Sequence, residues 1–338
     1  MSARELAHIC TENLAAVIHS TRARVELRIL PGEFKLDAMS TPDADTIRTA
    51  DGILRGPLRA PVNLFTGGGR AGSRNLNIHE DETAQRLGFR GGTIPGSIHM
   101  DQFVPLLLEA FGPAWFETGS LSLNFKNATI DREEVVAMLA SPPRRTDVQV
   151  EARMERPDGT IVAIGTASVG DPGEPAHLHA IDLRPADPSE LRILSGVQPG
   201  ATRLHHTARI ESPAVARRIE DGGLLDALPW YTGPSPWGGA IANPSAVVQL
   251  LRNRGGEFGP HVAHAVGLFG AIEVSHRAGP VLLDRDYEVQ GEVVATGASP
   301  RTEFVWYDTH ALDSSGGVVA SMRMQLRWMT ASSPLYRD

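Results

Sequence analysis

The segment NLNIHEDETAQRLGF, residues 75–89, holds a histidine next to acidic and amide side chains, a combination that suits proton transfer. A neutral imidazole accepts a proton near pH 7 without a large change in its pKa, so His79 is our first candidate for a general base. A histidine in a loop before a helix can also simply bond a backbone carbonyl. Asp81 is a candidate acid, although its place at the start of the helix expected for DETAQRL also suits an N-cap.

A second group of candidates surrounds Gly96, where a small turn leads into the apolar helix expected for SIHMDQFVPLLLEAF, residues 97–111. The first amides of a helix lack intrahelical acceptors, and such N–H groups can stabilise an oxygen that gains negative charge during a reaction. Glycine at position 96 lets a substrate approach the backbone closely. Ser97 in the first turn is a candidate for substrate binding. His99 is a second catalytic candidate or an ordinary half-buried histidine.

Three further residues near His79 are candidates for substrate binding. The amides of Asn75 and Asn77 can hold a water or a carbonyl oxygen without acting as acids. Arg74 suits a carboxylate or phosphate of the ligand, or it is a surface arginine. Glu80, on the same loop, is expected to be solvated unless it serves as an acid.

Hydrophobic periodicity predicts the elements that position these groups. Pro105 is expected to kink or split the long helix, and Gly88 to end the short one. The DG of PDGT predicts a hairpin turn. Strands are expected at residues 120–129, 133–142, 146–156 and 161–170. Upstream, the sequence predicts a helix at 4–19, a strand at 22–30 and irregular structure at 31–60.

The second half of the chain repeats this order. GGTIPGS at 91–97 corresponds to GGAIANPS at 238–245, and DREEV at 131–135 corresponds to DRDYEV at 284–289. A helix closed by Gly255 is followed by strands expected at 262–277, 287–297, 302–313 and 318–329. The repeat predicts an α+β fold with two copies of a helix wrapped by an antiparallel sheet. We expect a first domain at 1–170, a linker at 171–200 and a second domain at 201–338.

Composition excludes several classes of function. The net charge of −8 provides no basic surface for nucleic acid or anionic lipid. Cys10 is the only cysteine, and the histidine clusters at 177–179, 205–206 and 261–264 lack a carboxylate at ligand spacing, so no metal and no cofactor are expected. Neither a signal peptide nor a membrane span is expected, and the predicted location is cytoplasmic. The aromatic loop PWYTGPSPWGG, 229–239, either lines a pocket or packs the linker.

Taken together, these motifs resemble the MaoC-like hydratase/dehydratase group of the hot-dog superfamily, in a tandem double hot-dog form. The shared features are His79, Asp81, Ala84, Gly88, Phe89, Ile94 and Gly96, followed by the helix through Leu108. The resemblance is close over residues 60–170 and general in the second half. It implies that a histidine and an aspartate activate water, and that an amide at the start of the central helix binds the thioester oxygen.

One departure from the family pattern concerns the acid. The family's catalytic aspartate precedes the histidine by five residues, and here that position holds Arg74. No carboxylate lies between Phe65 and His79. The expected activity is hydration or dehydration of an enoyl or 3-hydroxyacyl thioester such as an acyl-CoA, that is, a hydro-lyase. The alternatives are an acyl-CoA thioesterase and a non-catalytic module that binds a thioester or small ligand. A homodimer of double hot-dog units is compatible with each.

Overall fold

The computed structural model places most of the chain downstream of residue 46. It describes residues 47–48, 51–65, 77–143, 145–184, 186–252 and 256–336. Contacts divide the chain into residues 1–44 and 45–338, so all described residues belong to the second of these units. The helix expected at 4–19 and the strand expected at 22–30 lie outside the described residues, as do Arg74, Asn75 and Gly255.

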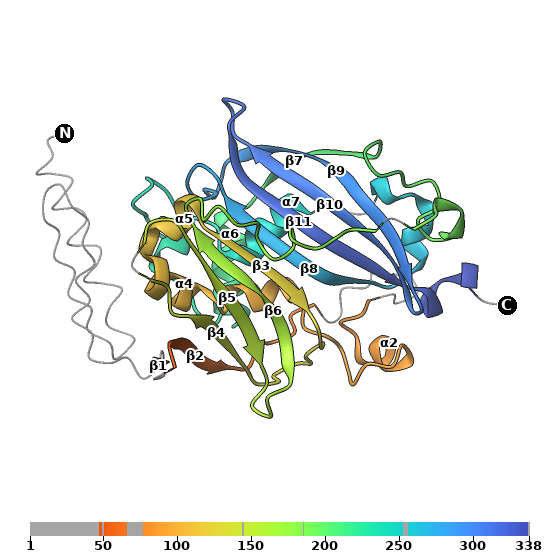
Figure 1. Cartoon of the computed structure of the whole chain (residues 1–338), viewed down its shortest axis with the longest axis horizontal. Coiled ribbons are helices and arrows are strands. Elements are labelled where there is room, and N and C mark those ends of the chain that lie inside the picture. The colour runs from red at the N-terminus through yellow and green to blue at the C-terminus, as the bar shows by residue number, and fades with distance from the viewer. Residues whose placement is uncertain are drawn as a thin grey trace, which may run out of the picture. The chain divides into compact units, whose positions relative to one another are not determined.

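One antiparallel sheet of eleven strands runs through the described residues, and both halves contribute to it (Figure 1). From one edge, the first half supplies β1 (Ile47–Arg48), β2 (Ile53–Arg59), β4 (Val135–Ala140), β5 (Val148–Glu155), β6 (Ile161–Val169) and β3 (Ser120–Phe125). The second half continues with β8 (Gly267–His276), β11 (Val318–Met329), β10 (Thr302–Leu312), β9 (Asp286–Ser299) and β7 (Arg203–Arg209). The halves join where β3 pairs with β8, from Ser120 opposite Ser275 to Asn124 opposite Ala271.

Each half wraps its part of the sheet around a central helix. In the first half this helix is split as expected, into α3 (Gly96–Asp101) and α4 (Val104–Phe111), because Pro105 cannot donate a backbone hydrogen bond and instead opens the second segment. In the second half it is α7 (Pro244–Leu251), which contacts α3. The remaining helices are α2 (Asp81–Arg86), α5 (Trp115–Thr118) and α6 (Ser212–Glu220). Short 3₁₀ turns cover Gly112–Ala114, Pro188–Glu190, Pro229–Tyr231, Gly256–Phe258, Pro260–His264, Thr330–Ser332 and Pro334–Tyr336.

The internal repeat is visible in the backbone as well as in the sequence. An isolated bridge joins Thr93 to Ile130 in the first half, and its counterpart joins Ile241 to Leu282 in the second. The turns that follow contain Arg132 at φ 56° and Asp284 at φ 59°, the only non-glycine residues with positive φ in the described chain. Since such residues are uncommon, their recurrence at matching places confirms the double hot-dog arrangement.

A buried charge network joins the two central helices. The Asp101 carboxylate accepts hydrogen bonds from Asn243 Nδ2 and Ser245 N, both at 2.8 Å, and pairs with Arg218 at 3.0 Å. Ser245 is the second residue of α7, so Asp101 on α3 caps the helix of the other half. The network therefore ties the register of α7 to that of α3, which carries the candidate site.

Three expectations about elements were wrong, and two elements were missed. Residues 31–60 were expected to be irregular, yet β1 and β2 lie there. The sequence reading also missed β7 and α6. Residues 261–264, expected within a strand, lie in the 3₁₀ turn Pro260–His264. Asp81 is the first residue of α2 and not its N-cap, which is Glu80 without a side-chain cap bond.

The described residues of the segment at 171–200 contain one 3₁₀ turn (Pro188–Glu190), several hydrogen-bonded turns and no α-helix or strand, as a linker would. Leu178 from this segment is buried against Ala271, Ala295 and Trp306 of the second-half sheet. His179 adds an ion pair to the buried Glu273 at 3.1 Å. The linker therefore packs on the sheet, while the expected domain boundaries stay a prediction.

Candidate active site

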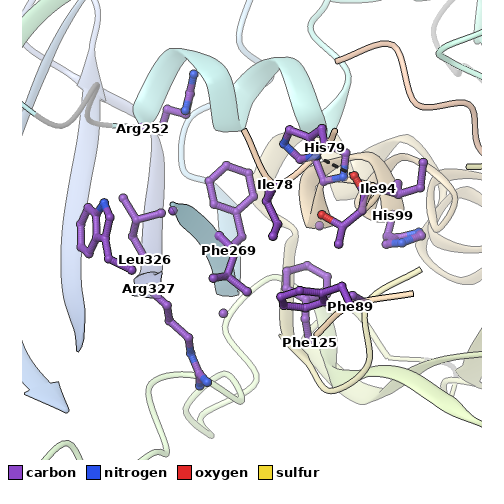
Figure 2. A pocket seen from close by; sticks show the side chains of 18 of the residues that line it. Ile78, His79, Phe89, Ile94, His99, Phe125, Arg252, Phe269, Leu326 and Arg327 are labelled. Atoms are coloured by element: carbon purple, nitrogen blue, oxygen red, sulfur yellow. Dashed lines mark hydrogen bonds between the residues drawn. The ribbon is translucent and has the colours of Figure 1, made fainter. Parts of the chain in front are cut away.

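A cavity of about 910 Å³ opens where the two halves meet at the end of β3 and the start of β8. Its size suits a small-molecule ligand. The first half contributes His79, Phe89, His99 and residues 93–96 and 125–129. The second half contributes Arg252 and residues 267–270 and 326–328. Figure 2 shows His79 and His99 on one side and Leu326 with Arg327 on the other.

The imidazole of His79 is held by a backbone carbonyl. Its Nδ1 lies 2.6 Å from the Thr93 oxygen, the contact drawn as a dashed line at His79 in Figure 2. A carbonyl oxygen can only accept, so Nδ1 must carry the proton and Nε2 is left with a lone pair. The carbonyl thus performs the orienting task that a carboxylate often performs for a catalytic histidine.

Two asparagines fix the backbone of His79. Asn77 Oδ1 accepts from the His79 N–H at 3.1 Å, and Asn77 Nδ2 donates to the Phe65 carbonyl at 2.8 Å. Asn63 Nδ2 donates to the His79 carbonyl at 2.9 Å. The same carbonyl packs on Gly92, where an added Cβ would lie 2.1 Å from the oxygen. The Asn77 amide, expected to bind substrate, is therefore engaged in positioning His79.

Burial lowers the pKa of His79 below its usual 6.5, and the charge of Arg252 acts in the same direction. The bond to Thr93 and the charge of Glu80 oppose this shift but do not cancel it. The Phe65 ring, whose centroid lies 5.3 Å from that of the imidazole, covers part of the ring. His79 is therefore neutral at pH 7, as a general base must be.

His99 lines the cavity, but both of its ring nitrogens are already bonded. Gln102 Nε2 donates to Nδ1 at 3.2 Å, which leaves Nε2 to donate to the Thr129 hydroxyl at 2.7 Å. Burial lowers the pKa of His99 to about 4. Both nitrogens of this neutral ring are engaged in hydrogen bonds, so no lone pair is free to accept a proton. We therefore assign His99 a structural role in the cavity wall and not the role of a base.

Gly96 lines the cavity as the first residue of α3, and the Phe125 ring packs directly on it. An added Cβ at position 96 would lie 2.4 Å from Phe125 Cε2. The glycine is thus required for the approach of Phe125, a role that the sequence did not indicate. Ser97 is fully buried outside the cavity lining, and its hydroxyl has no hydrogen-bond partner among the described residues.

Asp81 lies outside the cavity lining and braces the loop behind it. Its Oδ1 accepts from the Gly92 N–H at 2.7 Å. We expect Asp81→Ala to lower the free energy of unfolding by about 1 kcal/mol and to change turnover by less than about threefold, because only one part-buried hydrogen bond outside the cavity is lost. Asp81→Asn retains an acceptor and should restore the stability. A collapse of turnover in both variants, at unchanged stability in denaturant titration, would make Asp81 a catalytic acid.

Sequence reasoning did not identify which aromatic residues line the cavity, nor which residues of the second half would line it. Helix α2 ends in a Schellman turn, in which Phe89 N donates to the Ala84 carbonyl and Gly88 N to the Gln85 carbonyl. This turn delivers Phe89 to the cavity. The G-F pair at 88–89 was visible in the sequence, but nothing local indicated that Phe269 or Arg327 would lie opposite.

The aromatic loop at 229–239 does not line the cavity. Trp230 and Trp237 instead pack against Phe116 of α5, with ring centroids 6.2 and 5.9 Å away. The loop therefore has a packing role, but it packs on α5 and not on the linker as expected. Among the described residues, no three His, Cys, Asp or Glu side chains gather as a metal site would require, and no helix is long and apolar enough to cross a membrane.

Solved structures with a similar backbone were found at low sequence identity. A protein assigned as a MaoC domain dehydratase from Chloroflexus aurantiacus J-10-fl is 12% identical, with a TM-score of 0.52 over 76% of this chain and 88% of that one. The fold is that of the MaoC-like hot-dog proteins. A further MaoC-like dehydratase is 18% identical (TM-score 0.44, 72% and 87% covered). The tesB protein of Mycobacterium avium subs paratuberculosis is 11% identical (0.45, 84% and 95%).

Searches by sequence gave a different result. No family model matches the chain, and no curated protein matches it. The likeness therefore establishes the fold alone, and the activity must be argued from the cavity of this chain.

Proposed function

We propose that the protein is a hydro-lyase that adds water to, or removes it from, an enoyl or 3-hydroxyacyl thioester, with His79 as the base. The observation that carries this proposal is the bond from His79 Nδ1 to the Thr93 carbonyl, which leaves the lone pair of Nε2 available. The described residues that line the cavity include no Asp or Glu. A single histidine must then both take and return the proton.

The reaction balances with this one group. In hydration, Nε2 removes a proton from water while the water oxygen bonds to C3 and the electrons of the C2–C3 double bond move toward the thioester oxygen. We assign the binding of that oxygen to the N–H of Gly96, which opens α3 and belongs to the cavity lining. The imidazolium then returns the proton to C2. The six-residue length of α3 limits its macrodipole, so we assign the stabilisation to the local N–H group.

The dehydratase named among the structural neighbours supports hydration or dehydration chemistry on this fold. Incubation with crotonyl-CoA and longer enoyl-CoAs tests the proposal, with hydration followed as loss of enoyl absorbance. Release of free thiol without that loss would indicate a thioesterase instead. Binding without either change would indicate a non-catalytic module. Light scattering on the same sample tests the expected homodimer of double hot-dog units.

The pH dependence of kcat/KM follows from the lowered pKa of His79. The neutral imidazole is the active form, so activity should rise as the pH increases through the pKa of His79 and then level off. Because burial places that pKa below 6.5, the midpoint of this rise should lie below 6.5 and activity should be full at pH 7. An acid limb centred above 6.5 in a pH titration of kcat/KM would contradict the assignment.

A further inference from the structure

The cavity wall opposite His79 contains an arginine for which the described residues provide no counter-ion. Arg327, on β11, is half-buried and lines the cavity, yet no carboxylate of the described residues lies within ion-pair distance. Several other half-buried arginines do have one: Arg59 pairs with Asp226, Arg156 with Glu133 and Arg323 with Asp308. A buried charge without compensation is unfavourable, so an unpaired guanidinium in a cavity points to a charge supplied from outside the chain.

Strand register explains why Arg327 is unpaired. Arg323 and Arg327 project from the same face of β11, and their partners across β10 are Asp308 and Phe304. Asp308 binds Arg323 through two hydrogen bonds, at 2.8 and 2.7 Å. Phe304 offers Arg327 only its ring, at 5.9 Å from the guanidinium carbon. Arg323 thus has a counter-ion on the neighbouring strand, whereas the residue opposite Arg327 provides none.

The neighbouring residues hold Arg327 in a defined position. Its Nε donates to Oε1 of the buried Gln325 at 2.7 Å, which occupies one donor and leaves both terminal amino groups. Its side chain crosses Gly270, where an added Cβ would lie 2.5 Å from Nε. Gly270 is the extra residue of a bulge in β8, opposite the step from Gln325 to Leu326. Gly270, the bulge that contains it and Gln325 together fix the position of the Arg327 guanidinium.

We infer that the ligand of this cavity carries an oxyanion, either a carboxylate or a phosphate, which the two terminal amino groups of Arg327 bind. Planar pairs of N–H donors suit both groups. In Figure 2 the guanidinium points away from His79, so the anion lies at the other end of the ligand from the reacting carbon. Lys126, which also lines the cavity, adds to the positive potential. The identity of the rest of the ligand rests on the proposed function.

Three probes test this inference in a His79→Asn background, where binding is measured without turnover by calorimetry. Crotonyl-pantetheine is uncharged, crotonyl-phosphopantetheine adds a phosphate, and the pantetheine thioester of a long-chain 2-enedioic acid adds a carboxylate at the far end of the acyl chain. We expect one anionic probe to bind at least about tenfold more tightly than the uncharged probe, the size of effect typical of a charge-assisted hydrogen bond. The preferred probe identifies the source of the oxyanion.

Arg327→Met should remove this preference and leave the affinity for the uncharged probe unchanged. Phe304→Asp should act in the same direction, because it gives Arg327 the internal counter-ion that Asp308 gives Arg323. Arg192→Met is the matched control: Arg192 also stacks on an aromatic ring, that of Tyr336 at 4.8 Å, but lies outside the cavity lining. It should change nothing.

The inference is overturned if no anionic probe is preferred, or if the preference persists in Arg327→Met. Its failure can be separated from failure of the proposed function by following turnover of the same probes with the unsubstituted protein. If an anion is preferred through Arg327 but no probe is hydrated, the oxyanion site is supported and the proposed hydro-lyase activity is refuted. Hydration without an anion preference would do the reverse.

Discussion

His79→Ala is expected to lower kcat for enoyl thioester hydration by about 10² to 10⁴-fold, the usual contribution of a general base. The substitution removes Nε2 and also the bond from Nδ1 to the Thr93 carbonyl. Folding should be retained, because the ring is only half-buried and faces a cavity where water can replace its hydrogen bond. The measurement is the initial rate of loss of enoyl absorbance, with circular dichroism as a check of the fold.

Two companion variants make this result specific. His79→Asn can still donate to Thr93 but offers no ring nitrogen in place of Nε2, so it should lose as much activity as the alanine variant. His205→Ala is the control, because its side chain is exposed and pairs only with Glu288 at the far edge of the sheet. Full turnover in His79→Asn would show that His79 acts only by bonding the Thr93 carbonyl.

Asp101→Ala is expected to lower the free energy of unfolding by about 3–5 kcal/mol, the range for breaking a buried ion pair from one side. Arg218 would lose its carboxylate, and Asn243 and the Ser245 amide would lose their shared acceptor. Denaturant titration measures the change. Glu82→Ala provides the contrast, since its pair with Arg86 is exposed at 3.7 Å and should contribute less than about 0.5 kcal/mol.

A loss below about 1 kcal/mol in Asp101→Ala would mean that water replaces the carboxylate, and that the two central helices are held by apolar packing alone. A loss of the expected size accompanied by lower turnover would show in addition that the second half positions α3.

Much of the fold follows from the sequence because its patterns are local. The strands from 120 to 170 and from 267 to 329 are apolar or alternating runs bounded by turn residues, and Gly88 ends α2 at φ 84°. The missed strands have physical reasons. β2 contains Gly56 and Pro57, which shift its register against β4 and disguise the alternation. β7 is an edge strand with few buried residues, so polar side chains hide its pattern.

The candidate site was only half accessible to sequence reasoning. His79 and Gly96 stand in a recognisable motif, and both line the cavity. Asn63 binds the backbone carbonyl of His79, and the backbone carbonyl of Thr93 binds the His79 ring. Neither contact can be predicted from the residue types alone. Arg327 lies 248 positions from His79, and only the pairing of β3 with β8 brings its strand to the same cavity. Long-range sheet register is what local patterns leave undetermined.

The protonation state of His79 is the point on which the account depends most directly. Nuclear magnetic resonance of the protein labelled with ¹⁵N in histidine, with His79→Gln to assign the signal, reports which ring nitrogen carries the proton at pH 7. We predict a neutral ring protonated on Nδ1, with Nε2 unprotonated. A proton on Nε2, or on both nitrogens, at this pH would contradict the proposal that His79 is the general base.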